Sequence, residues 1–212
     1  MKWPIFILLA AALAGGSLQA GEGPELFYSK TFQGSMPPYV QITLDKTGQV
    51  EYREAAEDDS PHKYKLTEAE TTEVFGLAEK LGYFKTPVES DLKVAFMGKK
   101  VFRYQNGTEK HEVEFNYSED LNAKALWEWF ERMTESAQHR VELERTAKYD
   151  KLGVFKALTL LGSALERKRL VGLEQYLPML DRIIKNESYM HTARVRASEI
   201  AEAIRNANPA GQ

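Results

Sequence analysis

The chain has 212 residues, with 28 lysines and arginines against 31 aspartates and glutamates, and it contains no cysteine. The formal net charge of −3 argues against the basic surface that nucleic-acid binding requires, so no nucleic-acid partner is expected. Without cysteine the chain has no disulfide, thiolate metal site or thiol nucleophile, and it must fold by burying apolar surface alone.

Residues 1–20 have the three-part pattern of a secretory signal peptide: a positive start at Lys2, an apolar run over 5–14 and a small residue at the end. We predict cleavage between Ala20 and Gly21. The apolar run is about half of the roughly 20 residues that a membrane-spanning helix needs, so no stable membrane anchor is expected after cleavage. The mature chain is then periplasmic or secreted. The alternative, a buried N-terminal helix, would need cover on every side.

Residues 26–66 alternate between apolar and polar side chains, a pattern typical of half-buried antiparallel strands. The apolar positions are Leu26, Tyr28, Val40, Ile42, Leu44, Val50 and Tyr52. Turn-forming residues at 45–48 separate two of these strands, and an acidic loop at 57–61 leads into a short strand at 62–66.

A helix is predicted to follow at Thr67. Thr67 and Glu70 match a capping box, in which the two side chains satisfy free amide groups at a helix start. The apolar stripe of this helix consists of Val74, Leu77, Ala78 and Leu81. Gly82 stands where a left-handed C-terminal cap is expected, so the helix is predicted to end there.

Strands return after this helix. The alternation of Leu92, Val94 and Phe96 predicts one strand, and the Asn106-Gly107 pair predicts a hairpin that joins two more. A long helix is then predicted over residues 121–147, with one apolar stripe formed by Leu126, Phe130, Met133, Ala137 and Val141.

After residue 149 the sequence predicts three helices and no strand. The first, near 154–165, is apolar on nearly all sides, which indicates the middle of a small bundle. The predicted fold class is therefore α+β: an antiparallel strands-helix-strands-helix unit at 21–148, followed by a small helical domain at 149–207. Residues 208–212 are predicted to be a disordered tail.

Several motifs carry a resemblance to a known family. They are Phe27-Tyr28, Pro38-Tyr39-Val40, Tyr64-x-Leu66-Thr67 and Gly82-Tyr83-Phe84. Through them, residues 26–133 resemble an uncharacterised domain of exported bacterial proteins and lipoproteins. Many members have a Cys pair before the proline, where this chain has Gly34-Ser35-Met36-Pro37, so the resemblance implies a fold but neither a redox role nor an activity.

The last part of the chain is similar to a HEAT-type helix pair, through Leu177-Pro178-x-Leu180 and Arg194-x-x-Ala197-x-x-Ile200. Repeat solenoids need about three stacked units, and the sequence contains one convincing copy. We therefore interpret this region as a helical hairpin that closes the bundle.

No catalytic, cofactor-binding or metal-binding residue is predicted. The histidines lack the spacing that directs two imidazoles at one metal, although His62 and His111 would approach each other if their strands paired. Glu57, Asp58 and Asp59 could contribute to a calcium site, but their spacing is not that of an EF-hand, and such loops are usually only solvated. Serine-nucleophile and phosphate-loop motifs are absent from the sequence.

Trp127 is the one residue singled out as a contact for a partner. It lies at the edge of the long helix's apolar stripe, so it is either covered by a neighbouring segment or left as an anchor. The leading functional prediction is a non-catalytic exported protein that binds another envelope protein or a peptide. The alternatives are an envelope hydrolase with a carboxylate acid/base pair and a small-ligand binder.

Overall fold

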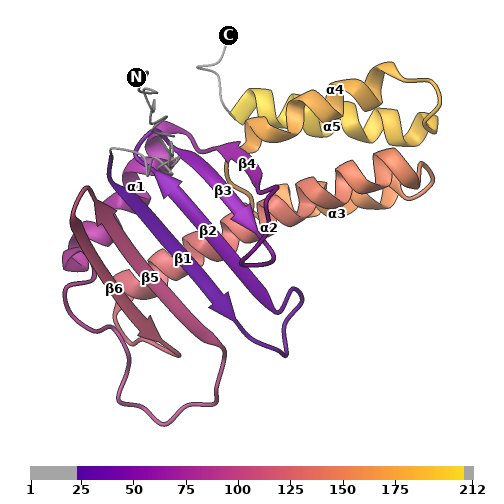
Figure 1. The fold of residues 1–212 in the computed structure, drawn as a ribbon. Helices are drawn as coiled ribbons and strands as arrows, with labels where there is room; N and C mark the ends of the chain where they lie inside the picture. Colours follow the sequence, from indigo (N-terminus) through magenta and orange to yellow (C-terminus); the bar gives the residue numbers. More distant parts are fainter. Residues whose placement is uncertain (1–22, 208–212) are drawn as a thin grey trace, which may run out of the picture.

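The computed structural model describes residues 23–207, which form a six-stranded sheet with two helices on one face and further helices beyond one edge (Figure 1). Every strand pair is antiparallel, in the order β4-β3-β2-β1-β5-β6. The strands are β1 (Glu25–Thr31), β2 (Tyr39–Asp45), β3 (Gln49–Arg53), β4 (His62–Lys65), β5 (Lys99–Asn106) and β6 (Glu109–Phe115). The predicted α+β class is confirmed.

The alternation of the strands gives the sheet one buried face. Leu26 and Tyr28 on β1 and Val40, Ile42 and Leu44 on β2 are buried, whereas the residues between them are mostly polar and partly exposed. Helices α1 (Glu68–Lys80) and α2 (Leu121–Tyr149) cover this face (Figure 1).

The start and end of α1 follow the predicted local chemistry. The Thr67 hydroxyl accepts a hydrogen bond from the Glu70 amide at 3.2 Å, and the Glu70 carboxylate accepts one from the Thr67 amide at 2.8 Å. This capping box satisfies amide groups that have no partner within the helix. Gly82 has a φ of 60°, the left-handed conformation that ends α1 before the short helix η1 (Gly82–Phe84).

Helix α2 belongs to two hydrophobic cores. Leu126, Phe130 and Ala137 contact the sheet core, whereas Leu143 and Ala147 belong to a second core in the C-terminal helices. With 29 residues the helix is about 43 Å long, enough to serve both. The C-terminal helices are α3 (Val154–Glu166), η2 (Leu173–Tyr176), α4 (Leu177–Lys185) and α5 (His191–Ala207).

Three buried tyrosines attach separate parts of the chain to the backbone of α2. The hydroxyl of Tyr64 on β4 donates to the carbonyl of Met133 at 2.9 Å, and that of Tyr176 on η2 donates to the carbonyl of Ser136 at 2.8 Å. The Tyr189 hydroxyl, just before α5, donates to the carbonyl of Ala147 at 2.9 Å. The sheet and the helices after it are therefore held by one common helix.

Three sequence expectations are wrong. Residues 91–98 form an irregular segment instead of a strand, because backbone groups of Ala95 and Met97 bond to the side chains of Asn116 and Lys100 instead of to a neighbouring strand. Val141 is 40% exposed, because α2 leaves the sheet there and Leu143 takes up the buried position. Helix α3 packs on α2 and α5 and leaves Phe155 and Leu160 exposed, so it lies at the edge of the helical group instead of its middle.

Candidate functional site

The irregular segment before β5 is fixed at both ends by hydrogen bonds to residues that follow β6. The Glu89 carboxylate accepts from the amides of Asn116 and Tyr117, and the Ser90 amide donates to the Tyr117 carbonyl at 2.8 Å. The Asn116 side chain accepts from the Met97 amide at 2.7 Å and donates to the Ala95 carbonyl at 3.1 Å. Both ends of the segment are therefore attached to the chain that follows β6.

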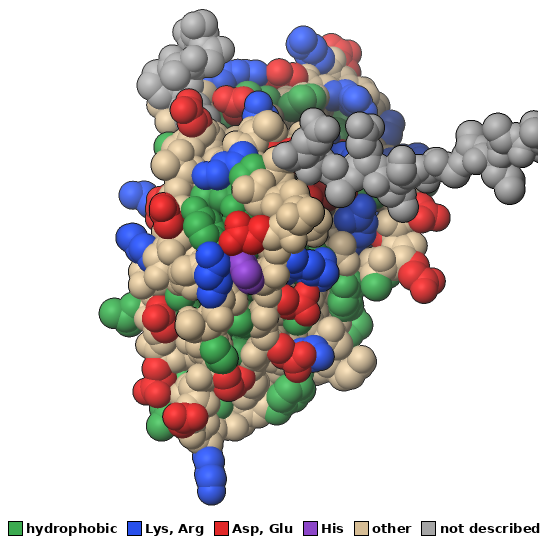
Figure 2. All heavy atoms as spheres, turned by 60° about the vertical axis from the view of Figure 1, so that its left-hand side comes forward, with side chains coloured by type: hydrophobic (Ala, Val, Ile, Leu, Met, Phe, Trp, Pro, Cys, Tyr) green, Lys and Arg blue, Asp and Glu red, His purple; other side chains and the backbone are tan. Residues whose placement is uncertain are grey.

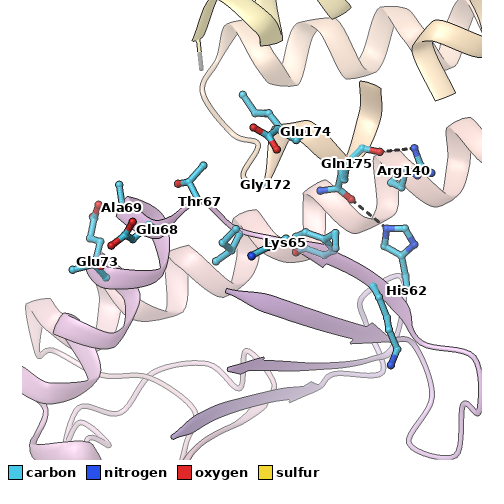
Figure 3. A pocket seen from close by; sticks show the side chains of 15 residues that line it. His62, Lys65, Thr67, Glu68, Ala69, Glu73, Arg140, Gly172, Glu174 and Gln175 are labelled. Carbon is cyan, nitrogen blue, oxygen red and sulfur yellow. Dashed lines mark hydrogen bonds between the residues drawn. The ribbon is translucent and has the colours of Figure 1, made fainter. Parts of the chain in front are cut away.

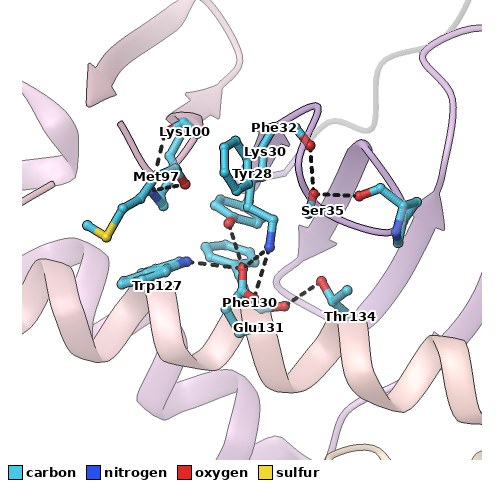
Figure 4. Close-up of polar contacts among 12 residues, drawn as sticks. Tyr28, Lys30, Phe32, Ser35, Met97, Lys100, Trp127, Phe130, Glu131 and Thr134 are labelled. Carbon is cyan, nitrogen blue, oxygen red and sulfur yellow. Dashed lines mark hydrogen bonds and ion pairs between the residues drawn. The ribbon is translucent and has the colours of Figure 1, made fainter. Parts of the chain in front are cut away.

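A buried ammonium group closes the base of this segment (Figure 4). Lys100 is 1% exposed, and its Nζ donates to the carbonyl of Asn116 at 2.7 Å and to those of Met97 and Gly98 at 3.3 Å. Burial lowers the pKa of Lys100, and the charge of Lys30 lowers it further. Three carbonyl dipoles thus compensate the buried charge and tie the segment to the sheet.

The held segment turns its large apolar side chains outward. Leu92 is 53% exposed, Phe96 64%, Val94 38% and Met97 37%, and we call these four residues the tip surface. Phe96 packs edge-on against Phe32 of the neighbouring β1–β2 loop, with ring centroids 6.1 Å apart. In the lower part of Figure 2, hydrophobic side chains are interspersed with charged ones.

A polar cluster lies beside the tip surface, between the sheet and α2 (Figure 4). One Glu131 carboxylate oxygen accepts from the Tyr28 hydroxyl at 3.0 Å, from Trp127 Nε1 at 3.1 Å and from Lys30 Nζ at 2.8 Å. Burial, followed by the Glu131 charge, raises the pKa of Tyr28 well above its usual value. The cluster joins β1 to α2 through a single carboxylate.

Trp127 is partly covered and partly accessible. It is half-buried against the sheet core, and Lys100 Nζ lies 4.8 Å from its ring centroid. It also lines a hollow of about 370 Å³ together with Tyr117, Lys124, Glu128, Glu131 and Arg169. A second hollow of about 230 Å³ shares Glu131 and Arg169 with the first and reaches Met36 and Pro37.

A further hollow, of about 1120 Å³, lies where β4, the start of α1 and η2 meet (Figure 3). Its polar groups connect these elements: His62 and Gln175 are 3.2 Å apart, and Arg140 donates to the Gln175 carbonyl at 2.6 Å. The Gly172 amide donates to the Glu70 carboxylate at 3.2 Å. Residues 172–175 thus cover the outer edge of β4, and these contacts indicate a structural junction.

The structure separates the other residues that the sequence suggested for a site. His62 and His111 lie on β4 and β6, the opposite edges of the sheet, so they do not approach each other. Within residues 23–207, no group of three or more His, Asp or Glu side chains is placed to hold a metal ion. The predicted signal peptide, the predicted cleavage residues Ala20 and Gly21, and residues 208–212 lie outside the described residues.

The tip surface was missed because its alternating pattern, Leu-Lys-Val-Ala-Phe-Met, is also that of a strand. Gly98, with a φ of 99°, marks the break before β5 and is the one local signal against a continuous strand.

None of the helices in the described part of the chain is long and apolar enough to cross a membrane. Comparison of the chain with protein-family models and with curated proteins gives no match. The resemblance to the exported bacterial domain and to a HEAT pair therefore remains a prediction.

Proposed function

We propose that the chain is an exported, non-catalytic binding protein whose tip surface inserts into an apolar hollow on another envelope protein. The single observation that carries the proposal is the tip surface itself: a segment fixed by hydrogen bonds that exposes Leu92, Val94, Phe96 and Met97. The residue pattern of 1–20 supports export.

The physical reason is that the exposure of apolar side chains to water is unfavourable unless a partner buries them. Exposed apolar side chains that cluster on a soluble protein mark interaction sites. A segment that is already fixed loses little conformational entropy on binding, so more of the burial energy appears as affinity. The segment protrudes beyond the ends of the strands (Figure 1), a shape that fits a concave partner better than an extended peptide.

The hollow beside Trp127 is proposed as the rim of this contact. Lys124, Glu128 and Arg169 place both signs of charge around the Trp127 and Tyr117 rings. Protein interfaces commonly have an apolar centre and a polar rim, and they are enriched in aromatic side chains and arginine. Trp127 is therefore proposed as a contact residue at the edge of the interface.

The proposal is tested by crosslinking from the tip surface in a bacterial host. A photo-reactive amino acid replaces Phe96 in one variant and Val141, an exposed apolar residue of α2, in the control. We expect one adduct at position 96 that is absent at position 141. The adduct's partner is then purified, and its binding to the wild-type chain, Phe96→Ser and Val141→Ser is measured by calorimetry.

Phe96→Ser should weaken this binding by about tenfold to a hundredfold, which corresponds to the roughly 1.5–3 kcal/mol gained by burying such a side chain. Val141→Ser should leave it unchanged. Equal binding by Phe96→Ser and the wild-type chain would refute the tip surface as the contact. Export is tested separately: the mass of the chain recovered from the periplasm should correspond to a first residue at Gly21.

A further inference from the structure

Helix α3 exposes a face on which Phe155 and Leu160 lie among the polar residues Lys156, Thr159 and Glu166, and nothing in residues 23–207 buries this face. Phe155 is 41% exposed, Leu160 is 49% exposed, and Leu152, just before the helix, is 77% exposed. The opposite face packs on α2 and α5, and Figure 1 shows α3 on the outer side of the helical group. A helix that is apolar on nearly all sides is normally buried on nearly all sides.

The charges at the two ends of this exposed face oppose the helix's own dipole. Lys156 lies in the first turn, near the positive end, and Glu166 is the last residue, near the negative end. Each charge would be better placed at the other end of α3. Arg167, the C-cap, has the favourable sign, and its Nε donates to the Ser163 carbonyl at 3.1 Å.

We propose that two copies of this chain associate through α3, packed antiparallel about a two-fold axis that crosses its exposed face beside Leu160 and Ser163. In an antiparallel pair each helix end lies beside the opposite end of its partner, so Lys156 and Glu166 both meet a favourable dipole. Positions 156 and 166 are equally far from 161, and the two-fold axis therefore places Lys156 beside the partner's Glu166. In the same register Phe155 faces the partner's Arg167, a cation–π pair.

The size of the face sets the strength of the association. Thirteen residues make a contact about 20 Å long and one helix wide, and such a strip buries less than the roughly 800 Å² per partner of a standard stable interface. We therefore expect a reversible dimer that forms over tens to hundreds of micromolar. Glu166 also contacts Arg196 of α5 at 3.3 Å, which holds its carboxylate at the edge of this face.

Sedimentation velocity of the purified chain over a wide concentration range tests the proposal. The wild-type chain should shift from monomer to dimer as concentration rises. Lys156→Glu and Glu166→Lys should each weaken the dimer about tenfold or more, and the double variant Lys156→Glu/Glu166→Lys should restore it. Leu160→Glu should abolish it, whereas Leu121→Glu, at the far end of α2 and 79% exposed in the wild-type chain, should not.

A wild-type chain that stays monomeric at several hundred micromolar overturns the proposal. A dimer that survives Leu160→Glu also overturns it. So does a double variant whose dimer affinity falls by the combined effect of the two single substitutions. Circular dichroism of each variant verifies its fold, since Glu166→Lys also removes the contact with Arg196. The proposal is independent of the tip surface, which lies on a different unit, so either can fail alone.

Discussion

Replacing Glu131 with leucine should destabilise the protein far more than its position on a helix surface would indicate. The carboxylate accepts hydrogen bonds from Tyr28, Trp127 and Lys30, and the Tyr28 side chain is fully buried. In Glu131→Leu the Tyr28 hydroxyl keeps its desolvation cost and loses the acceptor seen in the structure. A buried polar group left unpaired costs about 1–3 kcal/mol.

The two other donors add to this loss unequally. The Lys30 side chain is 16% exposed and loses an ion pair at 2.8 Å, which adds about 1 kcal/mol, whereas half-buried Trp127 can donate to water instead. The sum is about 3 kcal/mol, equivalent to a fall in Tm of about 6–12 °C for a chain of this size. Glu131→Gln keeps an acceptor and should lose about half as much.

Urea unfolding followed by tryptophan fluorescence measures this difference. The matched control is Glu128→Leu, one turn earlier on α2, where the wild-type carboxylate is 65% exposed and 3.4 Å from Arg169. It should change stability by less than about 0.5 kcal/mol. Tyr28→Phe should cost less in the Glu131→Leu background than in the wild-type chain. Equal stability of Glu131→Leu and Glu128→Leu would show that the cluster does not hold α2 to the sheet.

Three further predictions concern the junction between the sheet and the helices. Thr67→Ala removes the N-cap of α1 and should lower the free energy of unfolding by about 1 kcal/mol in urea titrations; no loss would contradict the capping role. Gly172→Ala should cost about 2 kcal/mol or more by the same measurement, because Gly172 has a φ of 57° and an added Cβ would lie 2.8 Å from the Lys65 carbonyl oxygen. Burial lowers the pKa of His62 and of His139 below 6.5, so the unfolded chain binds more protons just below that pH, and stability should fall as pH drops from about 7.5 to about 5. Replacing both histidines with glutamine should flatten this part of the profile, and an unchanged slope would count against the assignment.

Much of the fold could be predicted because its signals are local. The period of two in β1–β3, the capping box at Thr67 and the Asn106-Gly107 hairpin each depend on residues a few positions apart. Such features reflect backbone geometry and short hydrogen bonds that the neighbouring sequence largely determines. The three C-terminal helices were predicted for the same reason.

The candidate site could not be predicted because it depends on distant pairs. Lys100 is buried only because the carbonyls of Met97, Gly98 and Asn116 surround it, and the last of these follows a different strand. Glu131 meets Tyr28 across 103 positions of sequence. Trp127 was identified from the helical period. The sequence signal for its hydrogen bond to Glu131 is their spacing of four residues, which places both side chains on the same side of the helix.

Because α2 contributes residues to both cores, the two cores should unfold together. Unfolding of the C-terminal helices on heating would expose Leu143 and Ala147 to water. The end of α2 would then unfold towards Met133, whose carbonyl accepts a hydrogen bond from Tyr64. Calorimetry should then record one peak instead of two. A chain shortened to end near residue 148 would expose Leu143 and Ala147 to water, so we expect the sheet unit to be less stable without the C-terminal helices.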